Sequence, residues 1–116
     1  MTQTLKCLAQ ALPTPNTLTT LYTVPSSTST AVSSLEICNQ SPCLITFFVS
    51  YAIAGASDTP AQYIYSQMLL SPGITYQALI GITMAQTDQL RMKFIKPSSY
   101  SGAVNVSAQL FGCENS

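Results

Sequence analysis

The chain has no histidine and no tryptophan, and charged residues make up only 7% of its 116 residues. Without histidine, a serine or cysteine nucleophile lacks its usual general base. The five glycines do not cluster into a phosphate-binding loop. We therefore expect that the protein is not an enzyme and that it uses no cofactor.

The acidic residues are few and scattered, at Glu36, Asp58, Asp88 and Glu114. A glycosidase needs two carboxyl groups roughly 5–10 Å apart across the bond that it cleaves. Asp58 and Asp88 fall in predicted loops that could share one end of the fold, but scattered loop acids are usually solvated. We therefore expect two solvated carboxylates rather than a catalytic pair.

Basic residues are equally scarce, since the four Lys and Arg residues are offset by the four acids. The electrostatic attraction that drives binding to phosphate backbones is therefore missing, and we expect no nucleic-acid partner.

No window contains the roughly 18–20 unbroken apolar residues that cross a bilayer, so we expect no membrane span. The N-terminal residues also lack the apolar length and the cleavage site of a secretory signal.

The four cysteines are Cys7, Cys38, Cys43 and Cys113. Cys38 and Cys43 bracket a short turn, and they are the only local pair that could form a disulfide across two paired strands. A domain of this length can also build its core around buried free thiols, so both alternatives stay open. A four-cysteine zinc site needs two close pairs, and only one is present, so we expect no metal.

With so little charge, the polar surface must consist of Ser, Thr, Gln and Asn. An average soluble domain carries roughly 25% charged residues, whereas this chain has 7% and a net charge of +0. Such a surface gives little repulsion between copies, which favours self-association and burial against neighbours.

Residues 17–53 contain three β-rich runs, over residues 17–24, 30–38 and 44–53, separated by two short polar loops. This spacing predicts a meander of antiparallel strands. In the third run both faces are partly apolar, which is typical of a central strand or of a face that another subunit covers. On that outer face we expect Phe48 to contact a sister subunit.

Further alternating runs follow along the chain, each bounded by Pro, Gly, Ser or Asn. They cover residues 62–70, 74–82, 89–94 and 103–111. Seven to eight strands at spacings of roughly 8–12 residues, without a convincing helix, predict an all-β fold. We expect an antiparallel β-sandwich of the jelly-roll or immunoglobulin-like type, formed by residues 17–116.

Residues 1–16 differ from the rest because Pro13 and Pro15 force an extended backbone just before the first predicted strand. The segment is either an edge strand or an arm, and a disordered terminus is the alternative. Its apolar residues Leu5, Leu8 and Leu12 favour an extended N-terminal arm that docks on a neighbour.

The tyrosines could build an aromatic platform for sugars, although tyrosines in strands are more often half-buried packing residues. They are Tyr51, Tyr63, Tyr65, Tyr76 and Tyr100.

Residues 8–40 resemble the N-terminal half of small structural proteins of tailed bacteriophages. The resemblance rests on an apolar, proline-containing lead-in, the segment TLTTLYTVP at residues 17–25, and a strand that ends in Cys38-Asn39. It continues in the Tyr-Ile-Tyr of residues 63–65 and in GITMAQTD at residues 81–88.

This resemblance implies a non-enzymatic virion protein, made in the host cytoplasm, most simply a capsid decoration (cement) protein. The implied partners are the major capsid protein and the chain itself, as a homotrimer at three-fold points of the lattice. Two alternatives stay open: a tail, neck or fibre module of the same particle, and a carbohydrate-binding β-sandwich for surface attachment.

Overall fold

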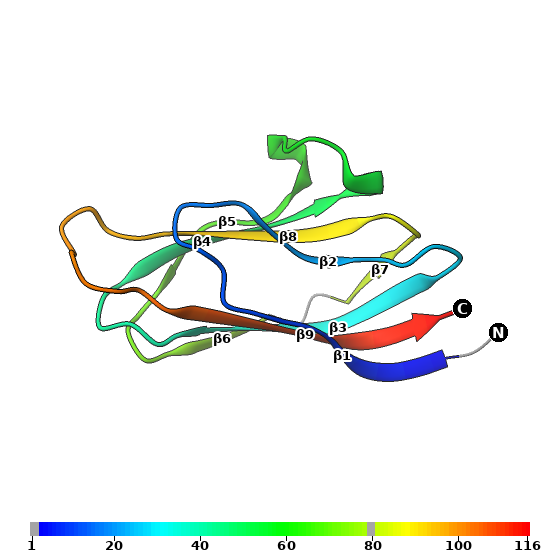
Figure 1. The fold of residues 1–116 in the computed structure, drawn as a ribbon, viewed down its shortest axis with the longest axis horizontal. Helices are drawn as coiled ribbons and strands as arrows, with labels where there is room; N and C mark the ends of the chain where they lie inside the picture. The colour runs from blue at the N-terminus through cyan, green and yellow to red at the C-terminus, as the bar shows by residue number, and fades with distance from the viewer. Residues whose placement is uncertain (1–2, 79–80) are drawn as a thin grey trace.

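The computed structural model describes residues 3–78 and 81–116, and within them the protein is all-β, with two antiparallel sheets packed face to face (Figure 1). The strands are β1 (Gln3–Ala11), β2 (Thr19–Thr23), β3 (Ser29–Asn39), β4 (Ile45–Ala52), β5 (Tyr63–Leu70), β6 (Thr75–Ala78), β7 (Ile82–Met84), β8 (Gln89–Ile95) and β9 (Val106–Asn115). Two short 3-10 helices, η1 (Ile53–Gly55) and η2 (Pro60–Gln62), lie between β4 and β5.

The first sheet has the order β1-β9-β3-β6, with β7 also paired to β3, and the second sheet has the order β2-β8-β4-β5. The core lies between them because strands such as β3 and β8 alternate buried inward residues with more exposed outward ones. Phe47, Met92 and Leu110 point into this core and are fully buried. Burying such a side chain contributes about 1.5–3 kcal/mol. The predicted sandwich of two antiparallel sheets is thus confirmed at this coarse level.

Most strand positions agree with the predicted runs, although the last run, predicted at 103–111, is β9 at Val106–Asn115. The predicted pairing of the meander is wrong. β2 and β4 belong to the second sheet, whereas β3 lies in the first sheet between β9 and β6. The loops at residues 24–28 and 40–44 therefore carry the chain from one sheet to the other. Alternation predicts where strands lie, but strand partners distant in sequence decide how they pair.

Two further differences raise the strand number within the described residues. The run predicted at 74–82 is present as β6 and β7, and residues 79–80 between them lie outside the described residues. Residues 3–11, predicted as part of an arm over residues 1–16, form β1 instead.

β1 pairs with β9 from Gln3 opposite Asn115 to Ala11 opposite Ala108, so it is an edge strand of the domain rather than an arm that extends from it. Of the alternatives expected for this segment, an edge strand is therefore the correct one for residues 3–11. Their backbone groups form hydrogen bonds with β9. Residues 1 and 2 of the predicted arm lie outside the described residues.

The disulfide between Cys38 and Cys43 is not formed, and all four cysteines are free thiols. The strands that flank the turn lie in different sheets and do not pair with each other. Cys38 lies between the buried residues Ile37 and Asn39 and so points to the outer face of the first sheet, whereas Cys43 packs against the core. The two side chains therefore point in different directions, which a disulfide cannot span.

β9 approaches β3 very closely at Gly112. A Cβ atom at this position would lie 2.3 Å from the backbone oxygen of Ala31 and 3.0 Å from Leu8. The register between the two strands shifts at the same place, between Val32 and Ser34. Glycine is therefore required here to let the two backbones approach each other.

Tyr22 joins the two sheets near the chain termini. From β2 of the second sheet, its hydroxyl donates a hydrogen bond to Glu114 of β9 and lies 2.8 Å from the Thr30 hydroxyl of β3. Lys6 of β1 also pairs with Glu114, at 2.7 Å. The hydrogen bond to Lys6, then that to Tyr22, lowers the pKa of the Glu114 carboxyl below its usual value, while burial raises the pKa of Tyr22 to about 12.

None of the helices within residues 3–78 and 81–116 is long and apolar enough to cross a membrane.

Candidate functional site

The segment between β4 and β5, residues 53–62, stands over the outer face of the second sheet (Figure 1). Asp88, from the turn before β8, holds its first half. The Asp88 carboxylate accepts hydrogen bonds from the Tyr51 hydroxyl, from the Ala54 N–H at 2.8 Å and from the Ala85 N–H at 2.9 Å. Arg91 adds hydrogen bonds to the carbonyl oxygens of Ala56 and Gly55.

Ala54 needs this support because its φ is +53°, in the left-handed region. That conformation costs a residue with a Cβ about 1–2 kcal/mol. Asp88 offsets the cost by binding the Ala54 N–H directly. The segment is therefore fixed at its start by a buried carboxylate that belongs to a distant turn.

Asp88 is only 3% exposed, so the prediction of a solvated loop acid is wrong for this residue. Burial alone would raise the pKa of its carboxyl, but the hydrogen bonds from Tyr51, Ala54 and Ala85 outweigh burial and lower it. The same contact acts on Tyr51: burial first, and then the hydrogen bond to Asp88, raises the pKa of the Tyr51 hydroxyl to about 12. Asp88 is thus an ionised structural anchor.

Asp58 is exposed, as predicted for a loop acid, and it has different partners from Asp88. Its Oδ2 accepts a hydrogen bond of 2.9 Å from the Tyr63 hydroxyl at the start of β5. The side-chain amide of Gln62 donates a hydrogen bond to the Ser57 carbonyl oxygen at 2.8 Å and accepts one from the Thr59 N–H at 3.4 Å. The second half of the segment therefore has a defined shape that presents Asp58 toward the sheet.

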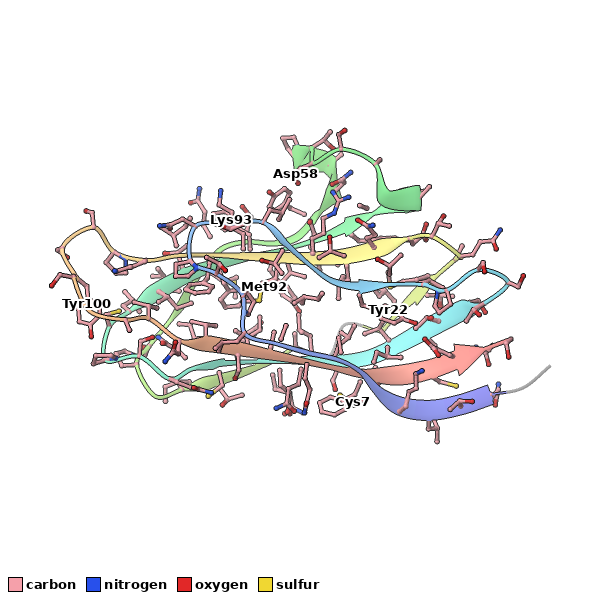
Figure 2. The ribbon with its side chains drawn as sticks, in the orientation of Figure 1. Cys7, Tyr22, Asp58, Met92, Lys93 and Tyr100 are labelled. Atoms are coloured by element: carbon pink, nitrogen blue, oxygen red, sulfur yellow. The ribbon has the colours of Figure 1, made fainter. Side chains whose placement is uncertain are left out.

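Between this segment and the sheet lies a pocket of about 460 Å³. Its lining comes from the segment, from β4 and β5, and from β8: Phe48, Asp58, Thr59, Pro60, Tyr63, Ser66 and Lys93. We call it the outer pocket. Lys93 and Asp58 lie on the outer side of the sheet, whereas Met92, the residue before Lys93, lies between the sheets (Figure 2).

Two aromatic rings line the outer pocket. The rings of Phe48 and Tyr63 meet edge to face, with centroids 5.9 Å apart and planes at 87°. Lys93 is paired with Phe48 in the strand register, and its Nζ lies 6.0 Å from the Phe48 ring centroid. The pocket thus combines two aromatic rings, one ammonium group, one carboxylate and hydroxyl groups, a mixture typical of ligand sites.

The residues predicted to form an interface do not come together in one place. Phe48 is half-buried in the outer pocket, and Leu8 packs against the core. Leu5 and Leu12 are exposed, at 85% and 61%, in β1 and in the residue after it, on the first sheet. Leu5 also lines a shallow hollow of about 200 Å³ with Ala31, Ser33, Gly112 and Cys113. The structure therefore separates an outer pocket from an apolar strand edge.

The tyrosines that were predicted as an aromatic platform also do not lie together in one place. Tyr65 and Tyr76 pack with Phe47 at centroid distances of 6.5 and 5.5 Å, and Tyr51 binds Asp88. Among the five predicted platform residues, Tyr63 alone lines the outer pocket. Lys93 and Ser66 were missed as site residues. The alternation of β8 places Lys93 outward, but only the pairing of β8 with β4 brings it beside Phe48.

In the part of the chain that the structure describes, no three His, Cys, Asp or Glu side chains gather into a potential metal-ligand set. Comparison of the chain with protein-family models, with curated proteins and with solved structures finds no match.

Proposed function

We propose that the protein is a non-enzymatic structural component of a tailed-phage virion, a decoration protein that binds the outside of the capsid lattice. The observation that carries the proposal is the exposed apolar edge of the first sheet, formed by β1 and the residue that follows it. Leu5 is 85% exposed and Leu12 is 61% exposed. The outer edge of β1 pairs with no other strand among the described residues.

Such an edge is unusual for a protein that stays free in solution, because unpaired backbone groups invite another chain to pair. Proteins usually protect edges with charges, but the one charged residue of β1, Lys6, is already paired with Glu114. Exposed leucines and an uncharged surface favour burial against the major capsid protein or against further copies of the chain, in a closed cyclic oligomer such as a trimer.

The strand order supports the jelly-roll type of sandwich, the finer fold expected from sequence. In the first sheet β9 lies between β1 and β3, and in the second sheet β8 lies between β2 and β4. Two interleaved Greek keys produce this arrangement, and the jelly roll built from them is common in viral capsid and lectin domains. Fold alone does not assign function, so the strand order supports the proposal without carrying it.

The contact surface is testable through Leu5 and Leu12, because both are exposed and can change without disturbing the core. We expect the double variant Leu5→Ser, Leu12→Ser to unfold at the wild-type temperature but to be lost from particles assembled in its presence. The matched control is Gln10→Ser, an exposed polar residue of the same strand, which should keep full occupancy. Full occupancy by the double variant would overturn the proposed contact.

A tail, neck or fibre module of the same particle would use the same fold at a different location. The two roles differ in copy number, because a decoration protein follows the number of capsid subunits and a tail module does not. A quantitative gel of purified particles separates them.

A further inference from the structure

We infer that the outer pocket is a binding site for a short neutral saccharide. This inference goes beyond the decoration role, because it concerns the second sheet and not the β1 edge. It rests on the residues that line the pocket, on their charges and on the way in which the segment 53–62 is held. The ring chemistry, the charge balance, the size and the rigidity of the pocket support it independently.

The aromatic rings of the outer pocket fit the shape of a sugar ring. A pyranose ring has an apolar C–H face and a rim of hydroxyl groups, so its binding site needs an aromatic surface surrounded by hydrogen-bonding groups. Phe48 and Tyr63 supply the aromatic surface. Asp58, Ser66 and Lys93 supply an acceptor, a hydroxyl group and a donor from the rim of the same pocket.

The charge balance favours a neutral ligand. Asp58 and Lys93 contribute one negative and one positive charge to the lining. In this pocket a phosphate would be repelled by the carboxylate, and a metal cation would be repelled by the ammonium group. A sugar can use both groups, because its hydroxyls donate to a carboxylate and accept from an ammonium. The hydrogen bond from Tyr63 occupies Oδ2 of Asp58, which leaves Oδ1 to accept from a ligand hydroxyl.

The size and the rigidity of the pocket fit the same class. A volume of about 460 Å³ lies in the range of roughly 300–1,000 Å³ that small-molecule sites occupy, and it limits the ligand to a few sugar rings. Phe48 and Lys93 lie on neighbouring strands, and Asp88 and Arg91 fix the overhanging segment. A site held in this way loses little conformational entropy when it binds.

Binding rather than hydrolysis is the expected chemistry. Glycoside hydrolysis uses two carboxyl groups, one on each side of the bond, and Asp58 is the only carboxylate in the pocket lining. The inferred role is therefore recognition of a saccharide without its hydrolysis.

The experiment is a glycan array probed with the purified full-length chain, followed by calorimetric titration of the best neutral saccharide. We expect wild-type binding to a related set of neutral glycans and a loss of affinity of roughly tenfold or more in Asp58→Asn and in Lys93→Gln. The matched control is Lys96→Gln, which removes a lysine outside the pocket lining and should leave the affinity unchanged.

Thermal unfolding of each variant checks that the fold is intact, since Asp58 and Lys93 are not core residues. The inference is overturned by a blank array, by binding of acidic glycans only, or by full affinity in both pocket variants. The double variant Leu5→Ser, Leu12→Ser should bind the saccharide normally. Failure of the saccharide site and failure of the decoration role can therefore be told apart.

Discussion

The two faces of the second sheet use neighbouring residues for different purposes. Phe47 is fully buried between the sheets, whereas Phe48 lines the outer pocket. Likewise Met92 is buried and Lys93 faces outward. The backbone that places one set in the core therefore also fixes the positions of the other set. The inward set therefore determines the stability of the sheet, while the outward set lines the pocket in which we infer that a saccharide binds.

The largest effect should come from exchanging the two phenylalanines for alanine, one at a time. Phe47→Ala leaves a cavity among Tyr65, Tyr76 and the rest of the core and should cost about 3–5 kcal/mol of unfolding free energy. Phe48→Ala should cost about 1 kcal/mol, because its side chain is only half-buried. Urea unfolding measures both. Equal losses would contradict the division between the faces.

The next effect concerns the two aspartates, one buried beneath the segment 53–62 and one exposed on it. Asp88→Ala leaves the N–H groups of Ala54 and Ala85 without their acceptor, and because both hydrogen bonds are only partly buried we expect a total loss of about 2–3 kcal/mol. Asp58→Ala should change stability by less than about 0.5 kcal/mol. Hydrogen exchange should show faster exchange at Ala54 in Asp88→Ala only. Unchanged protection there would show that Asp88 does not anchor the segment.

A smaller effect tests the first sheet at Gly112. Gly112→Ala would place a methyl group 2.3 Å from the Ala31 oxygen, so β9 and β3 must separate, at a cost of about 1–3 kcal/mol. The control is Gln109→Ala, on the same strand, which should be nearly neutral. A Gly112→Ala protein as stable as the control would show that the close approach is not required.

The smallest effect is the response to acid. The pKa values of Asp88 and Glu114 are lowered in the folded protein, so the folded state favours their ionised forms. Their contribution is complete above the unfolded pKa values of about 4 and is lost as the pH falls through the lower folded values. We expect stability to be flat from about pH 7 to 5 and to fall below about pH 4.

The matched comparison for this response is Asp88→Asn against Asp58→Asn, since the first removes a buried carboxyl whose pKa is lowered and the second removes an exposed carboxyl. Denaturant unfolding at a series of pH values should give a shallower acid loss in Asp88→Asn. Identical slopes in the two variants would contradict the role given to the Asp88 carboxylate.

Sequence alternation predicted most strand positions because inward and outward residues follow each other regularly, as in Leu90, Arg91 and Met92. It could not predict that β3 pairs with β9 and β6, since those partners are distant in sequence. The same limit hid the outer pocket, because Phe48, Asp58 and Lys93 come from three separate segments. The buried state of Asp88 likewise depends on Tyr51 and Ala54, which no local pattern connects with it.

The proposed virion role is tested most directly by the protein content of purified particles whose genome encodes this chain. We predict that quantitative mass spectrometry will find the chain at a copy number comparable with that of the major capsid protein. Its complete absence from the particles would contradict the proposed function.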